Sequence, residues 1–305
     1  MNITLRQLEY VVTIEQEGQF SLAAKRLNVA QPSLSAQVAS LESFFGGKFF
    51  IRSRKGVTTT PLGRDVIRRA RRILKETEGL KSIVNAGGQS RLSIGVLPSI
   101  GPYLLPPVVR KLHQIDPNLR LVVREGSTEQ LDRLLRNHQV DLIISTPEDH
   151  PVFPRQNLFI EQLWAAFATD NVNLASRQKI KLEAFAGMTF LTLERGHRLS
   201  HIVLGLAQRA GGYVSDEYTG TSLDAVRMMS ATGAGIAVLP DVYALSEAAR
   251  GDDIKLARIE HDEAQRQISM IYRNDIDYMD KIELICGLMK EEYQRLLALQ
   301  NSVQL

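Results

Sequence analysis

The 305-residue sequence contains a single cysteine, Cys286, and has no long apolar run. One cysteine cannot form a disulfide within the chain, and no Cys/His cluster has the spacing of a zinc site. No stretch approaches the ~18 apolar residues that a membrane span needs. The N-terminus also lacks the basic-then-apolar pattern of a signal peptide. We therefore expect a cytoplasmic protein with no metal, no cofactor and no dithiol switch.

Acidic residues are scarce at one end of the chain. Residues 1–90 contain 14 Lys and Arg but only 7 Asp and Glu, a net charge of +7, whereas residues 91–305 have a net charge of −4. Ten basic residues and one acid, Asp65, lie between Lys48 and Lys75. A basic end of this kind favours a polyanionic partner. Charge alone leaves a merely solvated basic helix as the alternative.

The first 60 residues have the pattern of a helix-turn-helix followed by a two-stranded wing. A capping box is expected to begin the first helix at Thr4, and Gly18 is expected to end it. The Gln31-Pro32 pair opens a later helix with proline in its first turn. Residues 48–59 read as two short strands around a basic turn.

The helix that opens at Gln31 has small hydroxyl and amide side chains opposite its apolar positions. Such a face can enter the major groove and bond base edges or phosphates. Gln37 is expected to read a base, because its amide can pair with adenine, and the wing arginines are expected to meet phosphates or the minor groove. A generic three-helix bundle is the alternative. The expected DNA-contacting residues are Gln31, Pro32, Ser33, Ser35, Gln37, Arg52, Arg54 and Thr60.

A helix with one apolar stripe is expected from Thr60 to about Val84. A lone helix of ~25 residues with a single stripe has no core of its own, so we expect it to pair two subunits. Beyond a hinge at 85–90, strands and helices alternate, which predicts an α/β domain with a mostly parallel sheet. Hydroxyl-bearing turns lead from strands into helices, where backbone N–H groups can bind an anion. The expected strands are 91–96, 119–124, 140–145, 188–193, 213–219 and 235–239.

Residues 1–63 resemble the winged helix-turn-helix of LysR-type transcriptional regulators. The resemblance lies in Ala23-Ala24, in the run Gln-Pro-Ser-Leu-Ser from Gln31 to Ser35, and in Thr60-Pro61-x-Gly63. It extends over the whole chain and implies a two-lobed effector domain like a periplasmic binding protein. The implied division is a DNA reader at 1–60, a dimerising linker helix and hinge at 61–90, and an effector domain at 91–305, with lobe I at 91–160 plus 266–305 and lobe II at 161–265.

The resemblance also implies partners. They are double-stranded promoter DNA, a small-molecule effector, a second subunit through the linker helix, and RNA polymerase, with dimers assembling into homotetramers. A regulator should lose DNA affinity steeply as salt rises, because phosphate contacts release counterions.

Two segments, 95–106 and 193–199, resemble the peroxide-sensing branch of the family. In that branch a reactive cysteine follows a Gly-His pair, and a resolving cysteine comes one helix later. Here Arg198 stands at the first place and, without a gap, Ala207 at the second. The thiol chemistry of that branch therefore cannot occur in this chain.

The cleft that surrounds those positions is expected to bind an effector reversibly. The resemblance implies that Ser99, Thr128 and His197 face it, and an arginine beside hydroxyls at helix starts suits a carboxylate or another small anion. The alternative is that Arg198 is an exposed helix-start residue and His197 only caps a turn. The expected effector-contacting residues are Ser99, Ile100, Thr128, Ser145, His197, Arg198, Thr221 and Ser222.

Three other functions remain open: a cysteine-independent oxidative-stress regulator, a solute-binding protein and an enzyme. The fused DNA reader argues against the second. No Ser/His/Asp arrangement or metal-ligand spacing is recognisable, so we expect no catalytic residue and no metal site. Placement at surfaces or helix ends is expected for His113, His138, His150, His201 and His261.

Overall fold

The computed structural model describes residues 3–53, 56–85, 90–170, 178–220, 222–247, 251–274, 276 and 279–302. Two of the predicted site residues, Arg54 and Thr221, lie outside the described residues. The chain divides into two compact units, of which the first holds residues 1–90 and the second holds most of residues 91–305. Within the described ranges, no helix is both long enough and apolar enough to cross a membrane.

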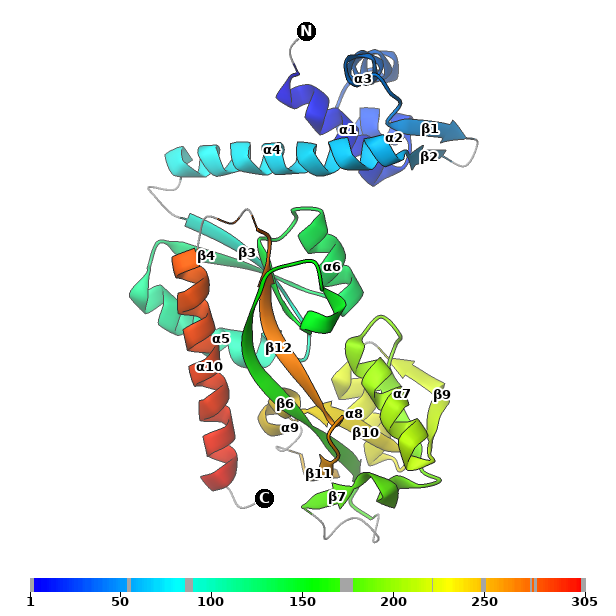
Figure 1. The fold of residues 1–305 in the computed structure, drawn as a ribbon, viewed down its shortest axis with the longest axis vertical. Helices are drawn as coiled ribbons and strands as arrows, with labels where there is room; N and C mark the ends of the chain where they lie inside the picture. Colours follow the sequence, from blue (N-terminus) through cyan, green and yellow to red (C-terminus); the bar gives the residue numbers. More distant parts are fainter. Residues whose placement is uncertain are drawn as a thin grey trace. The chain divides into compact units, whose positions relative to one another are not determined.

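In its described residues, the first unit has three helices, a two-stranded wing and a long fourth helix (Figure 1). The predicted ends of the first helix are confirmed: Thr4 and Gln7 form the capping box, and Gly18 ends the helix with a left-handed φ of 65°. The wing strands pair antiparallel, as expected. The elements are α1 (Leu5–Glu17), α2 (Phe20–Arg26), α3 (Gln31–Phe45), β1 (Phe50–Ser53), β2 (Gly56–Thr59) and α4 (Pro61–Asn85).

The start of α4 belongs to the core of this unit. Val66, Ile67 and Ala70 are buried in the same hydrophobic cluster as side chains of α1 and α3. The prediction of a helix without a core of its own is therefore wrong for these turns, because part of the apolar stripe packs within the subunit. Leu62 and Ile73 of that stripe stay exposed, at 38% and 45%. The side chains of its last members, Leu80 and Val84, lie outside the described residues.

The second unit has two hydrophobic cores, one in each of two lobes (Figure 1). The first lobe contains β3 (Ser90–Val96), α5 (Gly101–Ile115), β4 (Leu119–Glu125), α6 (Thr128–Arg136), β5 (Leu142–Ser145), the 3-10 turn η1 (Pro147–Asp149) and α10 (Met279–Ser302). The second contains β7 (Lys179–Lys181), η2 (Leu182–Phe185), β8 (Thr189–Leu193), α7 (Arg198–Ala210), β9 (Tyr213–Gly220), α8 (Leu223–Ala231), β10 (Ile236–Pro240) and β11 (Ile254–Glu260). The short helix α9 (Asp241–Ser246) contributes side chains to both cores.

Two long strands, β6 (Arg155–Ala168) and β12 (Gln265–Tyr272), run side by side between the lobes (Figure 1). The residues of β6 change from the first core to the second between Phe159 and Leu163. All six predicted strands exist to within two residues, but the prediction of a mostly parallel sheet is wrong at its centre. There β5, β12, β6 and β10 pair antiparallel in succession.

Candidate functional site

The exposed face of α3 has the composition that the sequence predicts. Leu34, Val38 and Leu41 are buried, so the opposite side of the helix faces outward. Of the predicted reader residues on this helix, Gln31, Pro32, Ser33 and Gln37 are exposed and Ser35 is half-buried. Proline stands in the first turn, and no side chain caps the helix start.

Arg52 of the wing is held against the helices. Its Nη2 donates to Ser35 Oγ at 3.3 Å, and its guanidinium carbon lies 3.8 Å from the centre of the Phe20 ring. A cation over an aromatic face is attracted by the ring quadrupole. The side chain is exposed, yet its direction is constrained by α2 and α3. No local pattern in the sequence identifies Phe20 as this platform.

Thr60 has an internal role. Its Oγ1 accepts from the Gly63 N–H at 2.9 Å and donates to the Lys48 carbonyl at 2.6 Å. The hydroxyl therefore caps α4 and ties it to the segment that enters the wing. This use of both hydroxyl functions makes Thr60 the least supported of the predicted DNA contacts.

A cavity of about 260 Å³ lies between the lobes of the second unit. Both lobes and the connecting strand β12 supply its walls. Five of the eight predicted effector residues line it: Ser99, Thr128, His197, Arg198 and Ser222. Its other charged or phenolic residues, which no sequence pattern singled out, are Tyr103, Glu125, Asp224 and Arg266.

Two contacts join the lobes at the start of α7. The Arg198 backbone N–H donates to Thr128 Oγ1 at 3.3 Å, and the Arg198 guanidinium lies 3.6 Å from the Asp149 carboxylate. The N-cap residue His197 does not cap α7 with its own side chain. His197, Arg198 and Leu199 line the cavity, so the positive end of the α7 dipole lies at the cavity wall. Arg198 is only partly exposed, at 37% of its side chain, which differs from a free helix-start residue.

Burial keeps two titratable groups of the cavity, His197 and Tyr103, neutral. Burial lowers the pKa of His197; Glu194 opposes this, and the nearby Arg266 charge adds to it. Its imidazole is therefore neutral near pH 7 and can donate or accept. Burial raises the pKa of Tyr103 to about 12, so the phenol is a hydrogen-bond donor.

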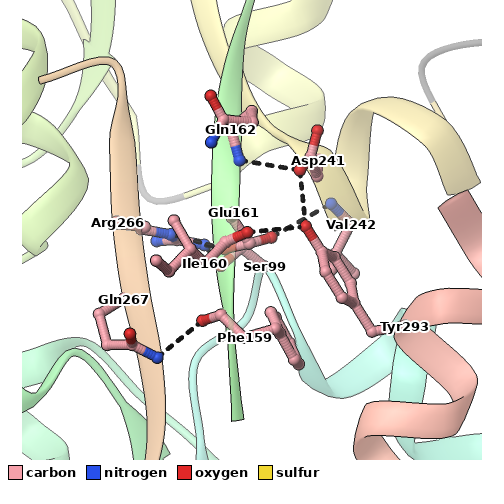
Figure 2. A network of polar contacts seen from close by, with 10 residues as sticks. All are labelled: Ser99, Phe159, Ile160, Glu161, Gln162, Asp241, Val242, Arg266, Gln267 and Tyr293. Carbon is pink, nitrogen blue, oxygen red and sulfur yellow. Dashed lines mark hydrogen bonds and ion pairs between the residues drawn. The ribbon is translucent and has the colours of Figure 1, made fainter. Parts of the chain in front are cut away.

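Arg266 forms one wall of the cavity and is itself buried (Figure 2). Its Nε donates to Glu161 Oε2 at 2.7 Å, and its Nη2 donates to Ser99 Oγ at 2.7 Å. The other Glu161 oxygen accepts the Val242 N–H at 3.1 Å. Strand β12 thus contacts both β6 and the turn before α5 through one guanidinium.

A second group of polar contacts, around Asp241, lies beside the Arg266–Glu161 pair (Figure 2). Asp241 accepts from the Gln162 N–H at 2.8 Å, from Trp164 Nε1 at 2.6 Å and from the Tyr293 hydroxyl at 2.7 Å. Burial raises the pKa of Tyr293, so its phenol is protonated and donates. The part of β6 that passes between the lobes is therefore linked to α10 through Asp241, by hydrogen bonds.

Two predicted effector residues do not line the cavity. Ile100 is fully buried in the core of the first lobe. Ser145 is fully buried as well, and its Oγ lies 3.1 Å from His150 Nε2. Because neither side chain reaches the cavity surface, both predictions are corrected.

The Ser145 contact belongs to a Ser–His–Asp arrangement that the sequence pattern did not show. His150 Nδ1 lies 3.1 Å from Asp132 Oδ1. His150 stands at the end of the 3-10 turn η1, as one of the two predicted placements has it, but it is fully buried. A catalytic serine needs access to substrate. Ser145 and His150 have no exposed surface, so this arrangement is a buried structural network.

The single cysteine is also buried. Cys286 is 2% exposed, and its Sγ lies 3.5 Å from the Met270 sulfur. Burial raises its pKa to about 12, so the reactive thiolate is not formed near neutral pH. In the part of the chain that the structure describes, no three His, Cys, Asp or Glu side chains form a group that could hold a metal.

Two family models match the chain. The one described as "LysR substrate binding domain" covers residues 85–292, and the one described as "Bacterial regulatory helix-turn-helix protein, lysR family" covers residues 5–64. The chain is similar to the DNA-binding transcriptional dual regulator OxyR of Escherichia coli, at 32% identity over 89% of this chain and 90% of that protein. It is also similar to the hydrogen peroxide-inducible genes activator of Pectobacterium carotovorum, at 30% identity over 96% of this chain and 97% of that protein.

A solved structure agrees with these relatives. Full-length OxyR of Pseudomonas aeruginosa, carrying a cysteine-to-aspartate substitution, matches with a TM-score of 0.72 at 28% identity. The match covers 95% of each chain. The similarity therefore covers both compact units of the protein.

Proposed function

Because the chain belongs to the LysR family of DNA-binding transcriptional regulators, we propose that a small anion bound between its effector lobes sets how it binds promoter DNA. The observation that carries this proposal is the cavity of about 260 Å³ with Arg198, the start of α7 and Arg266 in its walls. A fixed guanidinium beside hydroxyls can bind a carboxylate or phosphate with charge-assisted hydrogen bonds. Bound there, the anion would favour one arrangement of the lobes over another.

The cavity also contains acidic side chains, and these limit which anions can bind in it. Glu125 and Asp224 also line it, and Asp224 already accepts the Tyr243 hydroxyl at 2.6 Å. These carboxylates disfavour a second anionic group and favour a hydrogen-bond donor. The ligand that fits best is a carboxylate that also has a hydroxyl or amino group.

The DNA-reading role rests on the first unit. We propose that α3 enters the major groove with Gln31, Pro32, Ser33, Ser35 and Gln37, and that Arg52 meets a phosphate or the minor groove. The functional division that we propose is 1–60 for the reader, 61–90 for the linker helix and hinge, and 91–305 for the effector domain, with lobes at 91–160 plus 266–305 and at 161–265.

Assembly and location are further parts of the proposal. The exposed stripe residues Leu62 and Ile73 support pairing of two subunits through α4. We propose a homodimer of this kind, two of which form a homotetramer that contacts RNA polymerase in the cytoplasm and acts without catalysis.

The anion site has a direct test. The full-length chain is titrated with lactate, glycine, acetate and inorganic phosphate while its thermal unfolding is followed. Lactate or glycine should raise Tm more than acetate does, and Arg198→Ala should weaken the response roughly tenfold, because it removes a charge-assisted hydrogen bond. Arg209→Ala is the matched control, since Arg209 lies at the other end of α7 and pairs with the surface residue Glu263. Equal responses of both variants and the wild type would exclude an anion site at Arg198.

A second candidate is a cysteine-independent oxidative-stress regulator. The identity of about 30% to a hydrogen peroxide-inducible genes activator favours it. The buried thiol of Cys286, with its raised pKa, means that such a regulator would have to respond to the oxidant without thiol chemistry.

We expect hydrogen peroxide to leave the DNA affinity and oligomeric state of the wild type unchanged, because no thiolate is available to react. Gel-shift titration and light scattering before and after treatment measure both. Cys286→Ala is the control for thiol chemistry. A peroxide-dependent change in affinity that this variant abolishes would contradict the expectation, and a change that it retains would support the second candidate.

A further inference from the structure

The amide of Gln37 is oriented by a residue from another helix. The Thr4 backbone N–H donates to Gln7 Oε1 at 3.1 Å, and Gln7 Nε2 donates to Gln37 Oε1 at 3.1 Å. Gln7 is buried, at 7% exposed, whereas Gln37 is exposed on the outer face of α3. A backbone N–H can only donate, so the Gln7 amide cannot be turned round. Gln37 must therefore show its oxygen to Gln7.

We propose that Gln7 is a positioning residue that makes Gln37 present only its Nε2 donors to DNA. The oxygen of Gln37 is tied to α1, so the free end of its amide is an NH₂ group. This inference rests on the proposed role of α3 as the groove-reading helix. The sequence alone predicts that both amide atoms of Gln37 pair with adenine. The present inference replaces that prediction.

A donor in the major groove distinguishes two classes of base. Guanine presents the acceptors N7 and O6 and thymine presents the acceptor O4, whereas cytosine presents the donor N4 and adenine presents its N7 acceptor beside the N6 donor. Gln37 therefore selects the keto bases, guanine or thymine, over cytosine, which offers no acceptor, and over adenine, whose N6 donor lies opposite the second N–H of the Gln37 amide. Discrimination of about fivefold or more is expected at the contacted position, which is the lower end of the range for a specific base contact.

The bond pattern also predicts how to reverse the preference. In Gln37→Glu the group that faces the groove is a carboxylate oxygen, an acceptor. In Gln7→Glu the carboxylate still accepts from Thr4, since glutamate suits a capping box as well as glutamine. Its other oxygen then requires a donor, so Gln37 turns over and presents its oxygen to the groove. Both variants are expected to shift selection from keto to amino bases, although Gln7 itself is buried.

The experiment selects binding sites for the full-length chain from a randomised duplex library, followed by affinity measurements on single-base variants. Gln37→Ala identifies the contacted position as the one whose preference it removes. At that position the wild type should prefer guanine or thymine, and Gln37→Glu and Gln7→Glu should each prefer adenine or cytosine. Gln16→Glu adds the same charge to the exposed face of α1 and should leave the preference unchanged.

Two controls separate an effect on the orientation of the Gln37 amide from an effect on the stability of the DNA-binding unit. Gln7→Met removes the hydrogen bond without adding charge, and it should relax the base preference of Gln37 while thermal unfolding shows a folded reader. Gln37→Glu tests the same chemistry without a buried carboxylate.

A wild-type preference for adenine, or variants that weaken all sites equally, would overturn the inference. If the wild type showed no salt-dependent binding to any duplex, that result would instead count against the proposed function. The two failures are therefore distinguishable.

Discussion

Replacing Arg266 with methionine is expected to destabilise the effector domain by about 3–5 kcal/mol, because it leaves the Glu161 carboxylate buried and unpaired. Arg266 and Glu161 have side chains only 4% and 0% exposed, and their ion pair measures 2.7 Å. Because the Glu161 side chain has no exposed surface, solvent does not readily replace the lost guanidinium. Urea denaturation of the full-length chain, followed by a probe of the second unit, measures the loss.

Glu161→Gln should also be destabilising, since it leaves the buried Arg266 guanidinium without a charged partner. Combining Arg266→Met with Glu161→Gln removes both charges and should recover part of the loss, which gives a positive coupling energy in a double-mutant cycle. Ser99→Ala is the matched control, because it removes only a neutral acceptor from Arg266 and should cost about 1 kcal/mol. Additive losses in the cycle would show that the two residues do not act as a pair.

The destabilisation by Arg266→Met should depend on pH. Burial raises the pKa of Glu161 above its ordinary value, and the Arg266 guanidinium opposes the rise. Without that charge the native-state pKa rises further. A carboxyl with a raised native pKa stabilises the fold most below its unfolded pKa, and that contribution is lost as pH rises towards the native pKa. The deficit relative to wild type should therefore be smaller near pH 5 than near pH 8.

Replacing Gly63 with alanine is expected to destabilise the DNA-binding unit by about 3 kcal/mol and to abolish sequence-specific binding. A Cβ at this position would lie 2.2 Å from the Phe49 carbonyl oxygen and 2.9 Å from the carbonyl carbon. These are backbone atoms, and the Phe49 carbonyl also accepts the Thr60 N–H at 2.9 Å. The start of α4 must therefore move away from the wing.

Gly287→Ala is the control for the effect of removing a helical glycine. Gly287 lies in α10, where an added Cβ would meet no atom within 4 Å. This substitution should stabilise the protein by roughly 0.5–1 kcal/mol, because alanine has the higher helix propensity. Circular dichroism melting and gel-shift titration of both variants measure the difference. Wild-type stability and DNA binding in Gly63→Ala would contradict the close approach of α4 to Phe49.

The DNA-reading unit could be predicted from sequence because its signals are local. The capping box uses Thr4 and Gln7, three residues apart, and Gly18 ends the same helix with a left-handed backbone. The burial of Val66 and Ala70 was missed because the pattern shows an apolar stripe but not which surface covers it. The bond from Gln7 to Gln37 spans 30 residues, and no local pattern predicts it.

The centre of the sheet was harder to predict. Strand β6 pairs with β12 across the chain, with Phe159 opposite Ile268. Its first half has mixed burial, whereas its last six residues are all buried because β10 and β11 flank them. A strand that changes its burial pattern midway has no single period for the sequence to show.

The cavity was predicted in part for a similar reason. Thr128, Arg198 and Ser222 stand at helix starts, which sequence patterns reveal. Arg266 has no such marker, since its partners Glu161 and Ser99 lie 105 and 167 residues away. Ser145 also ends a strand and precedes a turn, yet it is buried in the interior, where its Oγ contacts His150.

The central claim is that an anion at Arg198 changes how the protein occupies DNA. Its most direct test is a DNase footprint and bending assay of the full-length chain on its selected duplex, with and without whichever of lactate or glycine raises Tm more. The anion should shift the footprint or the bend angle with wild type and Arg209→Ala, and it should have no effect with Arg198→Ala. An unchanged footprint and bend at saturating anion with the wild type would contradict the claim.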